Sequence, residues 1–290
     1  MFEELRPKST CPAYPPYHTG KYLEEYFFDF YERNKDRFDE LNRKYIPVYW
    51  TNCYNNGVLP EWGDRINLLE MQRRLNTLNP NESYFTVCQH DDAPMHSIPH
   101  NTVIFSAGGR VKTPLTVPIP LICGPLPSQK TRTKKHLASF VGSNTHHVRQ
   151  KTIDSLGDSS GIKISSDGWD MKVSYDRFTD FISTSLESRF VLCPRGYGPT
   201  SFRLYEAMQL DAVPVYISDE FWTPWTNEID WNEFCVMVHE SDINTLYDRL
   251  NSITDDEYEK MKEKMSEVYK KYFTLEATCE NILKILESEQ

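Results

Sequence analysis

The sequence predicts an α/β protein built on parallel β-sheets. The main evidence is the stretch 190–217, in which two short apolar segments flank a glycine-containing turn and a segment with helical spacing. A strand, a helix and a second strand joined in this way form a βαβ crossover, which makes the two strands parallel. Short apolar segments at 84–88, 101–106 and 137–141 are each followed by loop residues, as expected of further strands.

Length and composition point to two domains. A chain of 290 residues can form two domains of ordinary size, each with its own core. Five prolines between residues 112 and 127, followed by the polar and basic segment 128–135, predict a linker. We place the domain boundary near Ser128.

The charge and the cysteines exclude some classes of protein. A net charge of −10 and a pI near 5.3 argue against a nucleic-acid-binding protein, which would need a basic face. No run of about eighteen apolar residues is present, and the N-terminus lacks a signal-peptide core. The seven cysteines are never spaced as C-x-x-C, so we expect buried thiols in a reducing compartment. These observations predict a soluble, cytoplasmic protein.

The remaining elements follow from hydrophobic spacing. A buried strand is predicted at 45–50, with a loop at 51–57 beyond its C-terminal end. Other strands are predicted at 162–165 and 235–238, and helices at 22–30, 66–78, 175–184, 241–250, 255–272 and 278–287.

The turn inside 190–217 suits a phosphorylated ligand. Thr200 and Ser201 are candidate N-cap residues, and the helix that follows them presents free backbone N–H groups and a partial positive charge. Gly196 and Gly198 allow the backbone to approach a ligand closely. The sequence therefore predicts an anion site, such as a diphosphate site, at this turn.

Three charged residues flank this turn. Arg195 and Arg203 offer guanidinium groups that match phosphate oxygens, and the carboxylate of Glu206 could accept both hydroxyls of a ribose. The alternative is that Arg203 and Glu206 form a surface ion pair at i, i+3, and that the glycines only make a turn. The residues alone leave both interpretations open.

The segment FVLCPRGYGPTSFRLYEAM, followed by Val-Pro-Val and Asp219, resembles the core motif of the exostosin-like glycosyltransferases of family 47. The resemblance implies the GT-B fold: two Rossmann-like domains whose parallel sheets face each other across a cleft. It also implies an inverting reaction with a nucleotide-sugar donor. Asp211 stands where the family usually has glycine at the helix end, and aspartate tolerates a left-handed conformation moderately well.

The resemblance assigns a role to each part of the chain. It implies an acceptor-binding domain at 1–128, a nucleotide-sugar-binding domain at 129–272, and a C-terminal helix in 273–290 that packs back on the first domain. Most cellular relatives carry an N-terminal membrane helix, and this sequence shows none. A soluble member would suit a cytoplasmic glycosylation system, for instance one encoded by a large algal virus.

Further donor-site residues follow from the same resemblance. The segment Gly142–His147, with Arg149 behind it, resembles the family's Phe-x-Gly segment, which lies beside the donor phosphates. It implies Ser143 and Arg149 as secondary donor ligands. Asp219 follows the second strand of 190–217 and is also expected at the donor site.

The catalytic base is expected after the strand 84–88. His90 and Asp91 match the family's His-Asp-Trp-Gly-Pro segment, whereas Asp92 departs from it. An inverting transferase needs one base for the acceptor hydroxyl, and we rank Asp91 first, His90 second and Asp92 third. The alternative is a capping Asp91 and a packed His90.

The loop predicted at 51–57 is a candidate for acceptor binding through Tyr54 and Asn55, since ligands bind outside strand C-termini in open α/β sheets. A simple Asn-Gly turn is the alternative.

No Asp-x-Asp triad is present, so we expect a metal-independent reaction without a cofactor. Arg195, Arg203 and Arg149 would then neutralise the leaving diphosphate together with the helix N-terminus. The expected donor is a UDP-sugar, with UDP-xylose as a weak preference, and the expected acceptor is an oligosaccharide or glycoprotein glycan. The alternatives are a GDP-sugar transferase of the fucosyl type and an inactive protein that binds nucleotide sugars or glycans.

Overall fold

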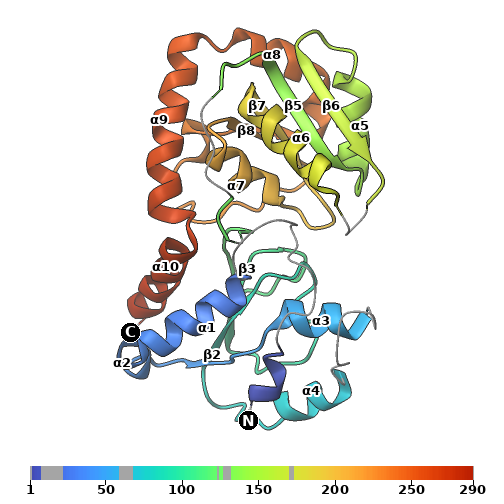
Figure 1. Ribbon diagram of the computed structural model, residues 1–290. Helices are drawn as coiled ribbons and strands as arrows, with labels where there is room; N and C mark the ends of the chain where they lie inside the picture. Colours follow the sequence, from blue (N-terminus) through green and yellow to red (C-terminus); the bar gives the residue numbers. More distant parts are fainter. Residues whose placement is uncertain are drawn as a thin grey trace. The chain divides into compact units, whose positions relative to one another are not determined.

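The structure is a computed structural model, and it describes residues 2–7, 22–58, 68–122, 124–126, 132–169 and 173–289. The chain divides into two α/β units (Figure 1). The first unit contains the described residues up to Gly124 together with Thr274–Gln290, and the second contains Pro125–Phe273. Ser128, where the sequence places the boundary, lies outside the described residues.

The first unit is built on a sheet of four parallel strands. Their order is β1 (Lys44–Tyr45), β2 (Tyr84–Cys88), β3 (Thr102–Ser106) and β4 (Thr116–Pro118). Every residue of β2 and β3 is buried, which is typical of parallel strands covered on both faces. The two strands predicted here from apolar runs are confirmed, while the short β4 lies in the proline-rich segment that the sequence predicts to be a linker.

Helices cover this sheet. They are η1 (Glu3–Leu5), α1 (Leu23–Arg33), α2 (Lys35–Asp39), α3 (Trp50–Val58), α4 (Leu68–Leu75) and α10 (Leu275–Ser288). The C-terminal helix α10 packs on α1, and Arg33 forms an ion pair with Glu276 across the two helices at 3.1 Å. The predicted return of the C-terminal helix to the first unit is therefore confirmed.

The predictions of a strand at 45–50 and a loop at 51–57 are wrong. The strand β1 ends at Tyr45, and α3 begins at Trp50. Pro47 has no backbone N–H with which to continue the ladder. Trp50, Cys53 and Tyr54 are fully buried at i, i+3 and i+4, and this packing outweighs the low helix propensity of the asparagines.

The second unit contains a five-stranded parallel sheet. The strand order is β6 (Ile162–Asp167), β5 (His136–Ser143), β7 (Ser188–Pro194), β8 (Val213–Ser218) and β9 (Val236–His239). β7 and β8 pair in parallel from Phe190 with Val213 to Pro194 with Ile217, which confirms the predicted βαβ unit. The strand order reverses between β5 and β7, and ligands in open α/β sheets bind at such a switch point, beyond the carboxyl ends of the strands.

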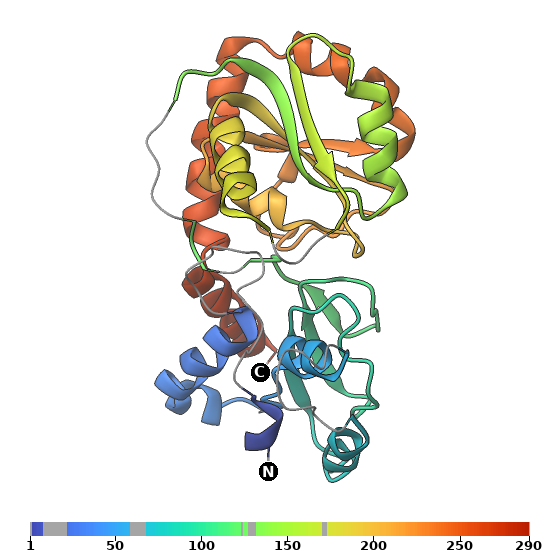
Figure 2. The ribbon, with the colours of Figure 1, turned by 45° about the vertical axis from the view of Figure 1, so that its right-hand side comes forward.

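Helices lie on both faces of this sheet. They are α5 (His147–Leu156), α6 (Tyr175–Leu186), α7 (Phe202–Gln209), η3 (Trp231–Glu233), η4 (Glu240–Thr245), α8 (Leu246–Ser252) and α9 (Asp255–Tyr272). Figure 2 shows α5 and α6 on opposite sides of the sheet. Phe140 of β5 belongs to the same core cluster as Val148 of α5, whereas its neighbour Val141 belongs to the cluster of Phe178 of α6. The helix predicted at 241–250 is in fact a 3₁₀ turn that leads into α8.

The ends of α7 agree with the sequence. Ser201 is the N-cap residue, and its hydroxyl accepts a hydrogen bond from the backbone N–H of Arg203 at 3.3 Å. Asp211 has a φ of 54°, the left-handed conformation expected just beyond the helix. The N–H of Ala212 donates to the carbonyl of Ala207, as in a Schellman C-cap.

Two further predictions concern burial and membranes. The five cysteines within the described ranges are free and buried; Cys11 and Cys123 lie outside these ranges. In the part of the chain that the structure describes, no helix has both the length and the apolar character needed to cross a bilayer.

Candidate active site

The candidate donor site lies at the switch point of the second unit. The loop 142–147 follows β5, the loop 195–201 follows β7, and Asp219 follows β8. Because the carboxyl ends of parallel strands meet at one edge of the sheet, the three segments are neighbours. The structure thus brings together the donor-site residues that the sequence singles out in this unit.

Arg195 shapes its own loop. Its side chain is only 10 % exposed and forms an ion pair with Asp219 at 2.5 Å. Its Nε donates to the carbonyl of Gly198 at 3.2 Å, and Nη2 donates to the carbonyl of Tyr197 at 3.1 Å. The guanidinium group thus holds the loop in a curve and is already engaged by protein acceptors.

Asp219 completes this arrangement. Burial opposes ionisation of its carboxyl group, but the hydrogen bond and the charge of Arg195 outweigh this effect, so the pKa of Asp219 lies below its usual value. The carboxylate is therefore ionised at neutral pH. The prediction that Asp219 lies beside the 195–201 loop matches the structure, and its contact there is Arg195.

Arg149 ties the two loops together. Its Nη1 donates to the carbonyl of Ser143 at 2.6 Å, and its Nε donates to the carbonyl of Arg195 at 3.0 Å. A Cβ atom on Gly196 would lie 3.2 Å from Nη2 of Arg149. Glycine at this position therefore leaves room for the guanidinium group beside the loop.

Arg203 and Glu206 form the ion pair that the alternative interpretation expects, but the pair is not on the surface. The two side chains are 18 % and 7 % exposed, and Nη1 of Arg203 lies 2.9 Å from the carboxylate. Nη2 of Arg203 donates to the carbonyl of Val141 at 2.8 Å, and its guanidinium stacks on Phe181 at 3.7 Å from the ring centre. Glu206 is thus held in one orientation beside the end of β5.

One polar group in the loop has no protein partner. The hydroxyl of Thr200 is buried and forms no hydrogen bond within the described residues. The neighbouring carbonyl of Pro199 accepts from the hydroxyls of Tyr216 and Ser218 at 2.5 and 3.3 Å. The Thr200 hydroxyl is therefore free to donate to a ligand in this loop.

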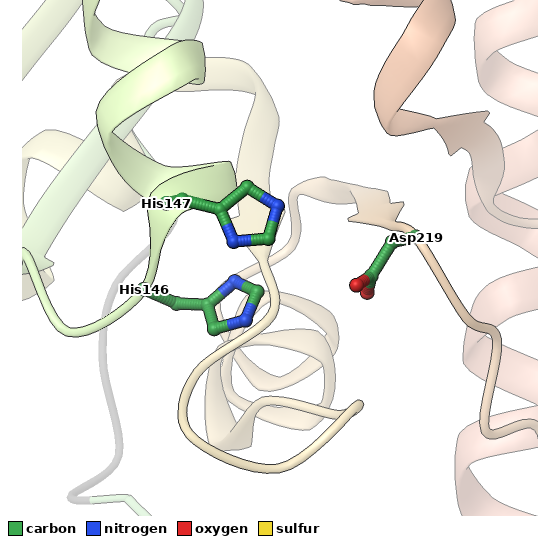
Figure 3. A group of neighbouring side chains, drawn as sticks. All are labelled: His146, His147 and Asp219. Atoms are coloured by element: carbon green, nitrogen blue, oxygen red, sulfur yellow. The ribbon is translucent and has the colours of Figure 1, made fainter.

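His146, His147 and Asp219 form a cluster at this edge of the sheet. Figure 3 shows the two imidazole rings side by side at the start of α5, with the carboxylate of Asp219 directed toward them. One ligand-type atom from each residue lies within 4.8 Å of the others. Histidine and carboxylate side chains are among the ligands that zinc prefers, so the cluster is a candidate metal site.

The cluster does not fit a metal ion well. Nδ1 of His146 accepts from the N–H of Val148 at 3.3 Å, Nε2 of His147 lies 2.9 Å from Glu240, and Asp219 is paired with Arg195. Burial and then the positive charge of Arg195 lower the pKa of His146, and the same positive charge would oppose a cation.

The second candidate region is the base loop, residues 90–92, which follows β2 in the first unit. The imidazole of His90 packs edge-on against Tyr54, and its Nδ1 accepts from the backbone N–H of Asp92 at 3.1 Å. Burial lowers the pKa of His90, so its ring is neutral at pH 7. Asp92 forms an ion pair with Arg110 at 2.9 Å.

The main chain of Asp91 contacts the main chain of the loop that follows β3. The N–H of Arg110 donates to the carbonyl of Asp91 at 3.3 Å. A Cβ atom at Gly108 would lie 2.3 Å from the Cα atom of Asp91, so only glycine allows this close approach. The base loop is therefore fixed against the loop that follows β3.

The acceptor candidates lie on α3 instead of a loop. Tyr54 is 1 % exposed, its hydroxyl accepts from the N–H of Met95 at 2.8 Å, and its ring stacks on His96. Asn55 follows it and is partly buried. Tyr54 is therefore a core residue that supports the base loop.

Sequence reasoning named the loop that contains His146 and His147 but not the two histidines as site residues. Two adjacent histidines at a helix start beyond a strand were the available signal. Glu240 was also missed, because its contact with His147 joins residues 93 positions apart.

A parallel sheet with a rigid, partly buried loop at its switch point defines a class of α/β proteins that bind nucleotides or similar ligands. Comparison with known proteins gives the family. The Exostosin GT47 domain matches residues 81–253, so the chain belongs to the exostosin GT47 family of glycosyltransferases. The match includes both candidate regions, and it confirms the resemblance seen in the sequence.

Three relatives illustrate the similarity. The Exostosin-1 homolog of Caenorhabditis elegans is 31 % identical over 113 residues, which is 39 % of this chain and 29 % of that protein. A probable β-1,4-xylosyltransferase of Arabidopsis thaliana is 37 % identical over 81 residues, 28 % of this chain and 20 % of that protein. A probable glucuronosyltransferase of Oryza sativa is 39 % identical over 83 residues, 27 % of this chain and 20 % of that protein.

These matches cover less than a third of the relatives' own length. Among solved structures, the crystal structure of TarM matches 74 % of this chain and 52 % of its own, at 11 % identity and a TM-score of 0.43. The fold itself is defined by the strand order of the two parallel sheets.

Proposed function

We propose that the protein is an inverting glycosyltransferase that moves a sugar from a UDP-sugar to a hydroxyl group of a glycan. The observation that carries this proposal is the rigid loop 195–201 at the switch point, with its unsatisfied Thr200 hydroxyl, in a chain of the exostosin GT47 family. The names of relatives include xylosyltransferase and glucuronosyltransferase, which supports a UDP-pentose or UDP-uronate donor, with UDP-xylose as our first choice.

In this proposal the diphosphate binds at the N-terminus of α7. The backbone N–H groups there and the hydroxyls of Thr200 and Ser201 donate to phosphate oxygens. Arg195, Gly196 and Gly198 shape the loop, and Arg149 and Ser143 hold the neighbouring loop in place. Arg203 keeps the carboxylate of Glu206 oriented for the ribose hydroxyls.

The base loop of the first unit supplies the proton acceptor. Asp92 is paired with Arg110, and Nδ1 of His90 already accepts a backbone hydrogen bond. We propose Asp91, a carboxylate just beyond the carboxyl end of β2, as the base that takes the proton of the acceptor hydroxyl while the sugar–oxygen bond forms and the bond to UDP breaks. The charge of Arg149 and the dipole of α7 stabilise the leaving UDP, and we propose that the reaction needs no metal ion.

Calorimetric titration with UDP and with GDP, each with and without EDTA, tests the proposal. We expect UDP to bind in preference to GDP and equally well with EDTA. Glu206→Ala should weaken UDP binding by about ten- to a hundredfold, because charged hydrogen bonds to the ribose are lost. Loss of UDP binding in EDTA, with recovery on adding Mn²⁺, would overturn metal independence.

A matched control separates ribose recognition from general loss of charge. Glu187 also forms ion pairs, with Arg132 and Lys135, but it precedes β7 at the amino end of the strand. Glu187→Ala should leave UDP affinity unchanged. Incubation with UDP-sugars then identifies the donor, since an active transferase consumes UDP-sugar when an acceptor glycan is present.

Two other functions make different predictions in the same assays. A GDP-sugar transferase of the fucosyl type would prefer GDP over UDP. A protein that only binds nucleotide sugars would bind UDP-sugars and leave them intact with every acceptor glycan tested. The orientation of Glu206 beside the α7 N-terminus accommodates the ribose of either nucleotide, so the base preference is the deciding measurement.

A further inference from the structure

A buried carboxylate lies at the N-terminal end of α1 in the first unit. Glu24 is 1 % exposed, and within the described part of the chain it forms no ion pair. Its oxygens accept hydrogen bonds from the backbone N–H of Gln89 at 2.7 Å, from the N–H of Thr51 at 2.8 Å and from the Thr51 hydroxyl at 3.0 Å. Burying a carboxylate without a cation costs free energy, so its place in the fold calls for an explanation.

Glu24 and Gln89 hold the start of the base loop between them. The side-chain carbonyl of Gln89 accepts from the N–H of Leu23 at 2.7 Å, so Gln89 is bound to the end of α1 through both its main chain and its side chain. Gln89 follows the last residue of β2 and precedes His90. The direction of its backbone therefore decides how the base loop leaves the sheet.

Glu24 also reaches the base loop by a second route. Thr51, which gives it two hydrogen bonds, lies in the first turn of α3. One turn further along α3, Tyr54 packs edge-on against the imidazole of His90, with 5.3 Å between ring centres. The same carboxylate thus fixes both the backbone before His90 and the helix that supports its ring.

We infer that Glu24 is the positioning residue of the base loop, and that its ionised carboxylate holds His90 and Asp91 in the orientation needed for sugar transfer. This inference rests on the proposed function, because it gives the base loop a role in transfer. Glu24 touches neither reacting atom, so its effect on transfer passes through Gln89 and α3.

The chemistry of Glu24 makes this positioning dependent on pH. Burial raises the pKa of Glu24 from 4.5 to about 7. The three hydrogen bonds favour the ionised form and lower the pKa, but their effect is smaller than that of burial. The ionised form accepts all three bonds. When the carboxyl is protonated, only the Thr51 hydroxyl among these partners can accept from it, because the other two are N–H groups.

In the base loop, the imidazole of His90 also titrates, and burial lowers its pKa below the usual value, away from that of Glu24. The charged neighbour is Glu25 on the same helix, which raises the pKa of Glu24 further. Five titratable groups of the neighbouring elements lie near Glu24: Tyr45 of β1, Cys88 of β2, Tyr49 just before α3, and Cys53 and Tyr54 of α3. Burial raises the pKa of each of these five groups, so they stay neutral.

NMR of the wild-type protein tests the positioning without any assay of activity. The backbone amide of Gln89 should shift with an apparent pKa of about 7 as the pH is varied between about 5 and 9. Glu24→Gln should abolish this transition, because its side-chain amide does not titrate. An unshifted Gln89 amide, or the same transition in Glu24→Gln, would overturn the inference.

Glu25→Gln is the matched control. Glu25 lies one residue away in the same turn of α1 and also binds α3, through Nδ2 of Asn52 at 2.9 Å, but within the described residues it forms no hydrogen bond with Gln89. This variant should keep the transition of the Gln89 amide near neutral pH. If the Gln89 transition is lost in Glu25→Gln, any change of charge in this turn moves the loop, and the specific role of Glu24 is overturned.

Kinetics connect the positioning to transfer. In wild type and Glu25→Gln, kcat should fall as the pH drops below about 7, while the KM for the donor stays constant, since the donor site lies in the second unit. Glu24→Gln should lower kcat about ten- to a hundredfold and remove this limb. An unchanged kcat and pH profile in Glu24→Gln would overturn the inference. A wild-type protein without transferase activity would instead refute the proposed function. In that case the NMR experiment would still decide whether Glu24 fixes the position of the base loop.

Discussion

The two loops that carry the candidate site are held in place by opposite means. In the second unit, Arg195 curves the 195–201 loop through carbonyl contacts, and its charge is neutralised by Asp219. In the first unit, Glu24 holds the start of the base loop without a cation, through two N–H groups and one hydroxyl. The first arrangement keeps its charges between about pH 5 and 9, whereas the second changes its protonation within that range.

This difference suits two tasks. Binding a diphosphate needs a rigid set of dipoles that is already in place, and paired charges provide it. If Glu24 positions the base loop as inferred, the loop should shift when the carboxylate is protonated. The following predictions test whether the contrast is real, from the largest expected effect to the smallest.

Arg195→Ala should have the largest effect. It leaves Asp219 and the carbonyls of Tyr197 and Gly198 without their donor, so we expect the free energy of unfolding of the second unit to fall by about 3 kcal/mol. UDP affinity should fall more than about a hundredfold as the loop loses its shape. Urea unfolding and calorimetric titration measure the two quantities.

The control for this prediction is Arg177→Ala. Arg177 pairs with Asp167 at 3.1 Å on the surface of the same unit, so its loss should cost less than about 1 kcal/mol. If the two variants lose the same stability, the 195–201 loop does not depend on its buried guanidinium group.

Glu24 should make the stability of the first unit depend on pH. The folded pKa is about 7 and the unfolded value is 4.5, so the unfolded chain ionises first as the pH rises. The contribution of Glu24 to stability is therefore greatest below pH 4.5, falls by on the order of 3 kcal/mol as the pH rises to about 7, and is constant above that. Urea unfolding of wild type and Glu24→Gln at several pH values measures the difference; parallel curves for the two proteins would contradict it.

Gly108→Ala tests the other support of the base loop. A Cβ atom there would lie 2.3 Å from the Cα atom of Asp91, so one of the two backbones must move. We expect a loss of about 2 kcal/mol in the free energy of unfolding and a lower kcat with unchanged UDP affinity. Gly168→Ala, where a Cβ atom would meet nothing within 4 Å, is the control and should be neutral.

The smallest expected effect concerns the ribose. UDP and 2′-deoxy-UDP should differ in affinity for wild type by about tenfold, because one charged hydrogen bond to Glu206 is lost. In Glu206→Ala the two nucleotides should bind equally. If the tenfold difference persists in the variant, another group recognises the 2′-hydroxyl, and Glu206 serves only as the partner of Arg203.

The sequence was most informative where local and global signals agree. The segment 190–217 combines strand-forming residues, a capping serine and helical spacing, and the structure contains β7, α7 and β8 there. It was least informative at 45–58, where the apolar run 45–50 and the asparagines that follow it suggest a strand and a loop. Packing of Trp50 and Tyr54 into the core decides that region, and such packing depends on residues far away in the chain.

The candidate site shows the same division. Sequence alone determined the α/β class and the position of the turn at 195–201, and it predicted Ser201 as one of two N-cap candidates, because each follows from neighbouring residues. Only the tertiary structure decided that Arg195 is bound by its own loop and Asp219, that the Arg203–Glu206 pair is buried, and that Glu24 meets Gln89 across 65 positions of sequence. Contacts of this kind depend on how strands and helices are brought together, and the pKa of a charged group depends on the burial that results.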